Sequence, residues 1–242
     1  MLRSSSSDPA TKAPARLPRL VASGLGYARS GEQIVGPLDL TLDSGEVLVI
    51  EGPNGSGKTT LLRVLAGLLE PTSGSLKFSH AQDSHGPDND GPDNDGSDND
   101  GSENQGRPRP GAIAWLPHQL GLKAALSARE NLAFGCALGG RRENTSPHAA
   151  LVRVGLDGFE DLPVGQLSAG QKKRVALAQL LCVPADIWLL DEPYANLDPS
   201  GYQLVTESVR AHAERGGLVA LTSHGHHATP PTGSARTLVL RG

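Results

Sequence analysis

One short stretch constrains this chain more than any other, because residues 52–60 match the pattern Gly-x-x-x-x-Gly-Lys-Thr. In order, the stretch reads Gly52, Pro53, Asn54, Gly55, Ser56, Gly57, Lys58, Thr59 and Thr60. In such a loop, consecutive backbone N–H groups close round a polyphosphate, and glycine avoids a Cβ that would collide with it. Lys58 can then reach the β- and γ-phosphates, and the Thr59 hydroxyl can bind Mg²⁺. The pattern predicts nucleotide phosphate binding.

The residues on either side of this loop support the prediction. Residues 47–50 are Val-Leu-Val-Ile, which indicates a short buried strand. Residues 60–66 predict a helix whose N-terminus, the positive end of its dipole, faces the anion. A chance match in a glycine-rich chain is the alternative, and the strand before and the helix after the loop disfavour it.

Length and charge narrow the class of protein. A chain of 242 residues can bury one sizeable core. The net charge of −4 is uneven, because residues 81–106 are acidic and hold no Lys or Arg. The remainder is mildly basic, which suits an anionic membrane face and is too weak to indicate nucleic acid as a partner. Cys136 and Cys182 lack metal-site spacing, so we expect buried thiols in a reducing compartment.

The sequence shows no pattern of a membrane span. No apolar run approaches the ~20 residues that a spanning helix needs, and there is no signal-peptide core. We therefore expect a cytoplasmic protein that meets a membrane only through a partner.

Two segments are predicted to be disordered. Residues 1–19 are rich in Ser, Pro and basic residues; a mitochondrial-type targeting peptide is the alternative, which Asp8 and three prolines disfavour. Residues 79–110 form an acidic low-complexity insertion, with a five-residue repeat in four copies at 86–105. We interpret it as an expanded hairpin loop; calcium binding is the alternative, but EF-hand spacing is lacking.

The rest of the chain, residues 20–242, predicts one α/β domain. Further strands are expected at residues 38–42, 75–78, 111–116, 187–190, 218–222 and 237–240. The first of these alternates at period two, as an antiparallel strand does, and residues 120–166 are expected to be mostly helical. Strands alternating with helices, with polar residues at strand ends, indicate a mainly parallel sheet with its site along that edge.

Two acidic residues follow a buried strand. Asp191 comes directly after Ile187-Trp188-Leu189-Leu190, so its carboxylate is expected at the edge of the sheet, where it can hold Mg²⁺ through water. Glu192 is then placed to polarise a water for in-line attack on the γ-phosphate. An incidental surface pair is disfavoured by the apolar strand before it.

A second phosphate-reading helix end is expected further along the chain. Leu167-Ser168-Ala169-Gly170-Gln171 precedes a predicted helix at 172–181, with Ser168 as its N-cap. This end and the loop at 52–60 cannot easily grip one γ-phosphate within one chain. A head-to-tail dimer solves the problem, because each copy lends its Ser168 end to the nucleotide of the other.

These residues resemble the ATP-binding subunit of an ABC transporter, from about residue 20 to the C-terminus apart from the acidic segment. The matching motifs are the Walker A loop 52–60, the Q-loop Gln119, the signature 167–171 with Ser168, Gly170 and Gln171, the Walker B strand 187–192, the D-loop Asn196-Leu197-Asp198 and the H-loop His224. The resemblance implies a P-loop NTPase fold of the ABC type. Its parts would be a RecA-like, mainly parallel sheet core, an antiparallel β-subdomain and a small helical subdomain at about residues 122–166.

The same resemblance implies roles for single residues. His224 would contact the γ-phosphate, Gln119 would couple Mg²⁺ to the membrane partner, and Asp198 would bridge the two nucleotide sites. The residue that stacks on adenine is open between Tyr27 and Arg29, both expected on the loop before the hairpin of residues 38–50. An ordinary surface role is the alternative for each.

Three stretches, residues 116–134, 167–178 and 191–198, make this short chain similar to the cytochrome c maturation (Ccm) ATPase family, the haem exporter ATP-binding proteins. The resemblance implies an ATPase that uses ATP and Mg²⁺ in c-type cytochrome biogenesis, for haem export or for release of haem from a chaperone. It implies integral membrane subunits of a Ccm-type transporter as partners, haem or a haem chaperone as an indirect partner, and a peripheral place on the cytoplasmic face of the inner membrane. The acidic repeat departs from the family.

Two other functions remain open from the sequence. One is the ATP-binding subunit of an ABC transporter for another substrate. The other is a soluble ABC ATPase acting on nucleic acid or ribosomes. Proteins of that class carry coiled-coil insertions, zinc motifs or two ATPase units in one chain, and this sequence has none of these.

Overall fold

The computed structural model describes residues 19–79, 112–138, 145–223 and 235–241, and it contains two sheets. An antiparallel sheet has the order β2-β1-β4, with β1 (Arg19–Arg29), β2 (Glu32–Leu42) and β4 (Ser73–Ser79). A parallel sheet has the order β5-β6-β7-β3-β8. Its strands are β3 (Val47–Glu51), β5 (Ile113–Leu116), β6 (Ile187–Leu190), β7 (Leu218–Thr222) and β8 (Ala235–Val239).

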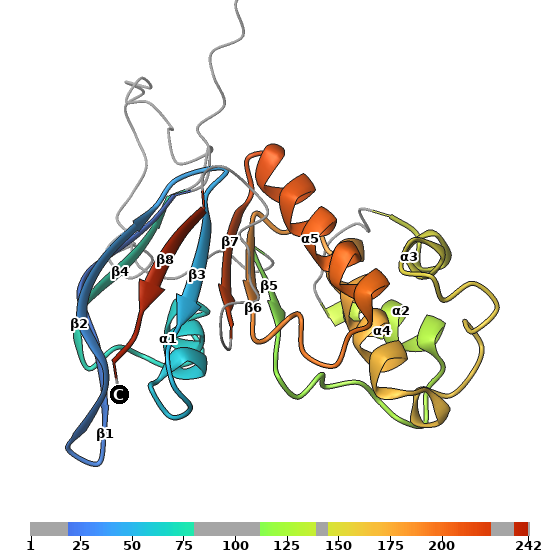
Figure 1. Cartoon of the computed structure of the whole chain (residues 1–242), viewed down its shortest axis with the longest axis horizontal. Helices are drawn as coiled ribbons and strands as arrows, with labels where there is room; N and C mark the ends of the chain where they lie inside the picture. Colours follow the sequence, from blue (N-terminus) through green and yellow to red (C-terminus); the bar gives the residue numbers. More distant parts are fainter. Residues whose placement is uncertain (1–18, 80–111, 139–144, 224–234, 242) are drawn as a thin grey trace, which may run out of the picture.

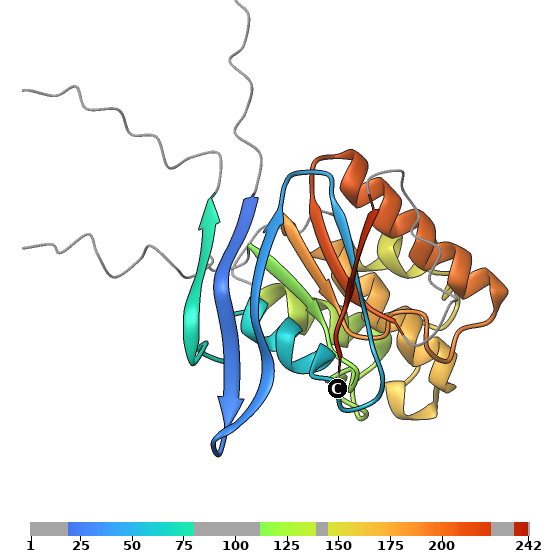
Figure 2. The ribbon, with the colours of Figure 1, turned by 60° about the vertical axis from the view of Figure 1, so that its left-hand side comes forward.

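The helices lie on both faces of the parallel sheet. They are α1 (Lys58–Leu65), α2 (Ala128–Leu138), α3 (Pro147–Arg153), α4 (Ala169–Cys182) and α5 (Pro199–Glu214), with a short 3₁₀ helix at Val164–Gln166. Helix α1 lies between the two sheets, and α4 and α5 lie on the opposite side of the parallel sheet, with α2 and α3 beyond them (Figure 1). Figure 2 shows β4, β1 and β2 side by side as a separate layer. The arrangement is the one expected for an α/β domain with an added antiparallel sheet.

The central strands are buried on both faces, which explains their unbroken apolar sequences. In β3, Leu48 and Ile50 belong to a core cluster shared with α1 and the antiparallel sheet. Val47 and Val49, whose side chains alternate with these, belong to the cluster shared with α4 and α5. Each fully buried side chain of this size contributes about 1.5–3 kcal/mol relative to exposure. The sheet is therefore held from both sides.

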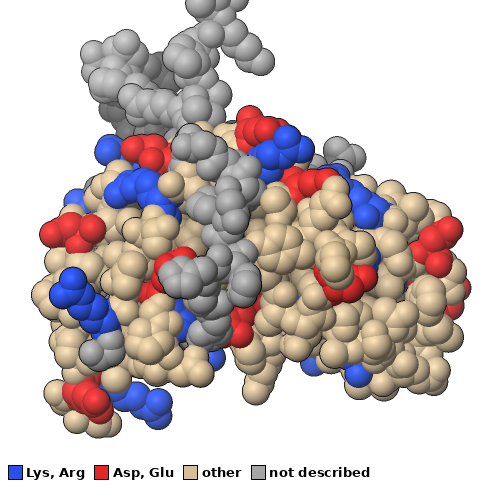
Figure 3. All heavy atoms as spheres, in the orientation of Figure 1, with Lys and Arg blue, Asp and Glu red and all other residues tan. Residues whose placement is uncertain are grey.

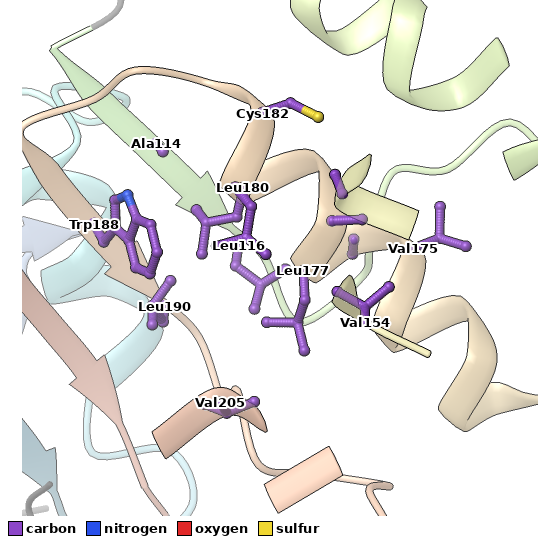
Figure 4. Close-up of a cluster of buried hydrophobic side chains, with 14 of the residues drawn as sticks. Ala114, Leu116, Val154, Val175, Leu177, Leu180, Cys182, Trp188, Leu190 and Val205 are labelled. Carbon is purple, nitrogen blue, oxygen red and sulfur yellow. The ribbon is translucent and has the colours of Figure 1, made fainter. Parts of the chain in front are cut away.

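Helix α4 buries one face against the parallel sheet. Leu177 and Leu180 lie near Leu116 of β5 and Trp188 of β6 in the larger core cluster (Figure 4). The same cluster contains both cysteines, so their predicted burial is confirmed. Packing on the sheet fixes the direction of α4, and with it the position of the Ser168 end of the helix.

Most of the predicted elements are confirmed, with shifted bounds. Strand β1 begins at Arg19, inside the predicted tail, and Arg19 Nε pairs with Asp43 Oδ1 at 2.8 Å. Helix α4 begins at Ala169 rather than at 172, because the cap at Ser168 starts it there. The stretch 120–166 contains α2, α3 and the 3₁₀ helix rather than continuous helix, and positive φ at Gly121 and Gly155 marks two of its breaks.

Two expectations were wrong or incomplete. Tyr27 and Arg29 lie in β1 and not on a loop before a hairpin of residues 38–50. Tyr27 pairs with Val35 and Arg29 with Glu32 of β2, whereas β3 belongs to the parallel sheet. Helix α5 was not predicted, although Asp198-Pro199 is a typical helix start. The predicted tail up to residue 18, the acidic repeat and His224 lie outside the described residues.

Candidate active site

The polar residues singled out from the sequence gather at the C-terminal edge of the parallel sheet. Strand register aligns the strand ends, because Leu116 pairs with Leu190, Leu190 with Leu221, and Ile50 with Thr222. The loop at 52–57 follows β3, and Asp191 follows β6. The fold therefore brings these segments to one edge, where α/β sheets bind ligands.

The loop after β3 is shaped by glycines that have no room for a side chain. Gly57 has φ 90°, and a Cβ there would lie 2.5 Å from Ile34 O. A Cβ on Gly52 would lie 2.6 Å from Ser56 Oγ and from Leu240 O. Ser56 Oγ is buried and has no hydrogen-bond partner among the described residues. The loop is thus closely packed against Ile34 and Leu240. Gly57 is the N-cap of α1, and the N-terminus of a helix favours bound anions.

Lys58 bends back over this loop. Its ammonium donates to Gly52 O at 2.7 Å and to Pro53 O at 2.9 Å, and the residue is buried. The hydrogen bonds to these two carbonyl groups keep the positive charge of Lys58 at the loop. A charge in that place can neutralise phosphate oxygens bound by the loop amides.

Hydrogen bonds between three side chains join the loop to the ends of β6 and β7. Thr59 Oγ1 donates to Asp191 Oδ2 at 2.9 Å, and Thr222 Oγ1 donates to Asp191 Oδ1 at 2.8 Å. The Asp191 backbone N–H donates to Leu116 O at 2.8 Å, which anchors the residue to β5. Asp191 and Thr222 are buried. A hydroxyl beside a carboxylate is the hard oxygen donor set that suits Mg²⁺, so these residues fit the metal.

Glu192 is held in an uncommon backbone conformation. Its φ is 51°, in the left-handed region that non-glycine residues rarely adopt. Its N–H donates to Thr222 Oγ1 at 2.8 Å, and its carbonyl accepts from Lys173 Nζ at 2.9 Å. Its carboxylate oxygen Oε2 lies 3.2 Å from His118 Nδ1. The two neighbouring carboxylates therefore have different partners, Thr59 and Thr222 for Asp191 and His118 for Glu192.

The predicted signature end of α4 is capped within its own chain. Ser168 Oγ accepts from the Gln171 N–H at 3.2 Å, and Gln171 Oε1 accepts from the Ser168 N–H at 2.9 Å. This capping box sets where the helix begins. Gly170 lies close to the next segment, since a Cβ on it would be 3.4 Å from Asn196 O. Ser168 is exposed, so its helix end is accessible from outside the chain.

Asp198 is the N-cap of α5 and accepts from the Gly201 N–H at 2.9 Å. Ser200 Oγ donates to it at 2.9 Å, and Arg174 Nη2 donates to it at 2.9 Å. These hydrogen bonds, that from Gly201 first, lower the pKa of the Asp198 carboxyl. Arg174 also donates to Val154 O at 2.8 Å. Arg174, in the second turn of α4, therefore connects this helix to the C-terminal end of α3 and to the N-cap of α5.

The structure adds three residues near Glu192 that the sequence did not single out as site residues. These are His118, Lys173 and Thr222, each in hydrogen-bond or ion-pair contact with Glu192. Two of them could have been noticed in the sequence. Thr222 is a polar residue at the end of the apolar strand β7, and Lys173 stands at a position of α4 where the helical pattern places apolar residues. Burial lowers the pKa of the Lys173 ammonium, and the charges of Asp191 and Glu192 oppose that shift.

The remaining predicted residues stand apart. Gln119 is exposed, two residues beyond Pro117 at the end of β5. Tyr27 is half-buried and packs against the core cluster that contains α1, and Arg29 is exposed at the end of β1. The helices of the described residues fall short of the length and apolar content that a membrane-spanning segment needs.

Comparison with known proteins agrees with this geometry. Residues 35–195 match the family described as ABC transporter. The chain is 46% identical over 214 residues, 88% of this chain and 90% of the other, to the cytochrome c biogenesis ATP-binding export protein CcmA of Xanthomonas oryzae pv. oryzae. It is 39% identical to the protein of that name from Pseudomonas putida, over 88% of this chain and 93% of the other.

Solved structures show the same fold at lower identity. A nucleotide-free ATP-binding cassette from an ABC transporter matches with a TM-score of 0.68 and 18% identity, over 93% of this chain and 88% of the other. A dimeric ATP-binding cassette in a post-hydrolysis state, bound to ADP and Pi, matches with a TM-score of 0.66 and 24% identity, over 85% and 88%. The chain belongs to the ABC transporter family of ATP-binding proteins, and its relatives include the cytochrome c biogenesis ATP-binding export proteins CcmA.

Proposed function

We propose that this chain is the ATP-hydrolysing subunit of a membrane ABC complex that serves c-type cytochrome biogenesis. The observation that supports hydrolysis best is the hydrogen bond of 2.9 Å between Thr59 and Asp191, which joins the phosphate loop to the end of β6. Cytochrome c biogenesis is the process named for relatives that are up to 46% identical over most of the chain. Export of haem and release of haem from a chaperone are both included.

ATP binding rests on charge and on fixed donors. The loop amides and the Lys58 ammonium would neutralise the phosphate oxygens, while Thr59 and Asp191 would hold Mg²⁺, with the exposed Gln119 as a further ligand. Bound Mg²⁺ supplies further neutralisation of the phosphate charge. Because the donors are already in place, little reorganisation is needed when ATP binds.

Hydrolysis needs a water aimed at the γ-phosphate. Glu192 directly follows Asp191 and its carboxylate is held by His118, so we expect it to orient that water and accept its proton. Ser168 and Gly170 of the second copy, together with His224, would complete the contacts to the γ-phosphate. Catalysis of this kind is positioning plus electrostatic stabilisation.

The exposed end of α4 supports a shared site. Ser168 is exposed and its capping box leaves the backbone N–H groups of Ala169 and Gly170 free of that box. A second copy, related head to tail, would place this end against the nucleotide held by the first. Asp198, which accepts a hydrogen bond from Arg174 of α4, would bridge the two nucleotide sites of such a dimer.

Partners in the membrane would meet the helical part of the chain. Four of the exposed large apolar side chains of the described residues belong to this part: Phe134 on α2, Val152 on α3, and Phe159 and Leu162 on the loop that follows. Such side chains favour an integral membrane subunit as the binding partner. The chain would then be peripheral, on the cytoplasmic face of the inner membrane.

Nucleic acid binding is the less favoured function. On the face in Figure 3, basic and acidic side chains of the described residues are interspersed. Proteins that bind nucleic acid gather Lys and Arg in a patch or stripe. The alternative nearest to the proposed function is an ABC transporter for another substrate, since its ATP-binding subunit would use the same ATP site.

The test is a deletion of the gene followed by staining for covalently bound haem. We expect c-type cytochromes to disappear and to return with the parent gene, but not with Glu192→Gln. Intact c-type cytochromes in the deletion strain would overturn the assignment to cytochrome c biogenesis. Hydrolysis of ATP by Glu192→Gln at the parent rate would overturn the catalytic assignment.

A further inference from the structure

The candidate catalytic residue Glu192 is contacted on both its side chain and its main chain. The carboxylate meets His118, which follows β5, and the main-chain carbonyl meets Lys173, on α4. The two partners come from segments that are distant in sequence and that carry the Q-loop and the signature motif. A left-handed residue needs such outside contacts to persist.

His118 fixes the carboxylate. Its Nδ1 lies 3.2 Å from Glu192 Oε2, and the ring is 60% exposed while the glutamate side chain is 20% exposed. The Nδ1 atom carries a proton in one neutral tautomer and in the cation, so the contact does not require a charged ring. Because Gln119 is the next residue, any movement of that loop moves the partner of the carboxylate.

Lys173 fixes the peptide. Lys173 is 5% exposed, and its ammonium donates to Glu192 O at 2.9 Å. A buried ammonium is costly unless hydrogen-bonded and near negative charge, and the carboxylates of Asp191 and Glu192 supply that charge. Lys173 lies one turn into α4 from Ser168, the end expected to meet the second nucleotide. Displacement of α4 is thus transmitted to the Glu192 backbone.

We propose that His118 and Lys173 are positioning residues that together hold Glu192 in its productive orientation, one through the carboxylate and one through the peptide. This proposal rests on the proposed function, in which Glu192 orients the attacking water. It makes the hydrolytic water sensitive to two separate events, movement of the Gln119 loop and engagement of the Ser168 end. Both contacts are made to Glu192 itself, while the Lys173 ammonium acts on Asp191 only through its charge.

The test uses steady-state hydrolysis by the purified full chain with Mg²⁺ and ATP. His118→Ala and Lys173→Met each remove one contact, and we expect kcat to fall about ten-fold or more while KM for ATP stays within about two-fold, because a misplaced base loses positioning but not binding. His118→Asn keeps an N–H near the place of Nδ1 and is expected to retain at least about half of the parent kcat.

Two controls match these variants. His148→Ala removes a similar pair, His148 Nδ1 to Glu160 Oε1 at 3.3 Å with a ring 59% exposed, in the helical part. Lys172→Met removes an ammonium that donates to Gly165 O at 3.3 Å. Both controls are expected to keep the parent kcat.

The outcomes are distinct. Parent kcat in both His118→Ala and Lys173→Met, or loss in His118→Asn as large as in His118→Ala, overturns the proposal. If Lys173→Met fails to fold, the comparison of His118→Ala with His118→Asn tests the proposal, because His118 is exposed and its replacement is not expected to disturb folding. Glu192→Gln is assayed in parallel: its inactivity alongside unaffected positioning variants would refute the positioning proposal and leave the ATPase assignment standing.

Discussion

The hydroxyl of Thr222 is the connection on which the site depends most, and replacing it by Val tests that dependence. Thr222 is fully buried; its Oγ1 donates to Asp191 Oδ1 at 2.8 Å and accepts from the Glu192 N–H at 2.8 Å. Valine has nearly the same shape and neither capacity. The substitution therefore removes two polar contacts and leaves the packing of β7 almost unchanged.

The magnitude follows from the two contacts. A hydrogen bond to a charged group contributes about 1.5–3 kcal/mol, and a buried donor left without a partner costs about 1–3 kcal/mol. We expect Thr222→Val to lower the free energy of unfolding by about 3 kcal/mol in total, allowing for partial relaxation. With a typical dependence on urea, the unfolding midpoint shifts by about 1 M or more.

Urea unfolding followed by circular dichroism measures the effect, with ATP hydrolysis as a second readout. We expect kcat to fall as well, because the Asp191 carboxylate and the Glu192 backbone lose a common anchor. Thr222→Ser is the matched control: it keeps the hydroxyl, loses one methyl group and should cost only about 1 kcal/mol. The reasoning is refuted if the valine variant is as stable as the parent within about 0.5 kcal/mol while the serine variant is not.

Three further changes have expected outcomes. Gly57→Ala should abolish ATP binding, measured by equilibrium dialysis, because the added Cβ would lie 2.5 Å from Ile34 O at a φ of 90°. Burial lowers the pKa of His212 to about 4, so the unfolded chain takes up this proton first as pH falls. Unfolding free energy should drop between about pH 6.5 and pH 4, by at most about 3 kcal/mol, and His212→Gln should remove that part of the pH profile. Asp198→Ala should lower the melting temperature more than Asp198→Asn, which keeps an N-capping oxygen.

Local patterns were sufficient to predict the elements and motifs that depend on neighbours in sequence. The loop before α1, the strand before Asp191 and the cap at Ser168 are such cases, because each pattern specifies its own backbone conformation. The resemblance to ABC transporter subunits added the fold class, a mainly parallel sheet core with an antiparallel β-subdomain and a helical subdomain, and the structural comparisons confirm that fold.

Contacts between distant segments could not be predicted in the same way. His118 and Lys173 meet Glu192 only because β5 lies beside β6 and α4 packs across the sheet. Tyr27 was expected on a loop, whereas pairing with Val35 of β2 extends β1 through it. The start of helix α5 is indicated in the sequence by Asp198 followed by Pro199. That indication was missed because Asp198 was interpreted only as part of a D-loop.

Sedimentation of the Glu192→Gln variant tests the central claim, that two copies share the nucleotides, most directly. We expect this variant to be monomeric alone and dimeric with ATP and Mg²⁺, and to stay monomeric with ATP when Ser168→Arg is added, because the bulky cation blocks the exposed end of α4. The parent chain carrying Ser168→Arg alone should still bind ATP and lose hydrolysis. A strictly monomeric parent chain with full turnover, unaffected by Ser168→Arg, would contradict the account.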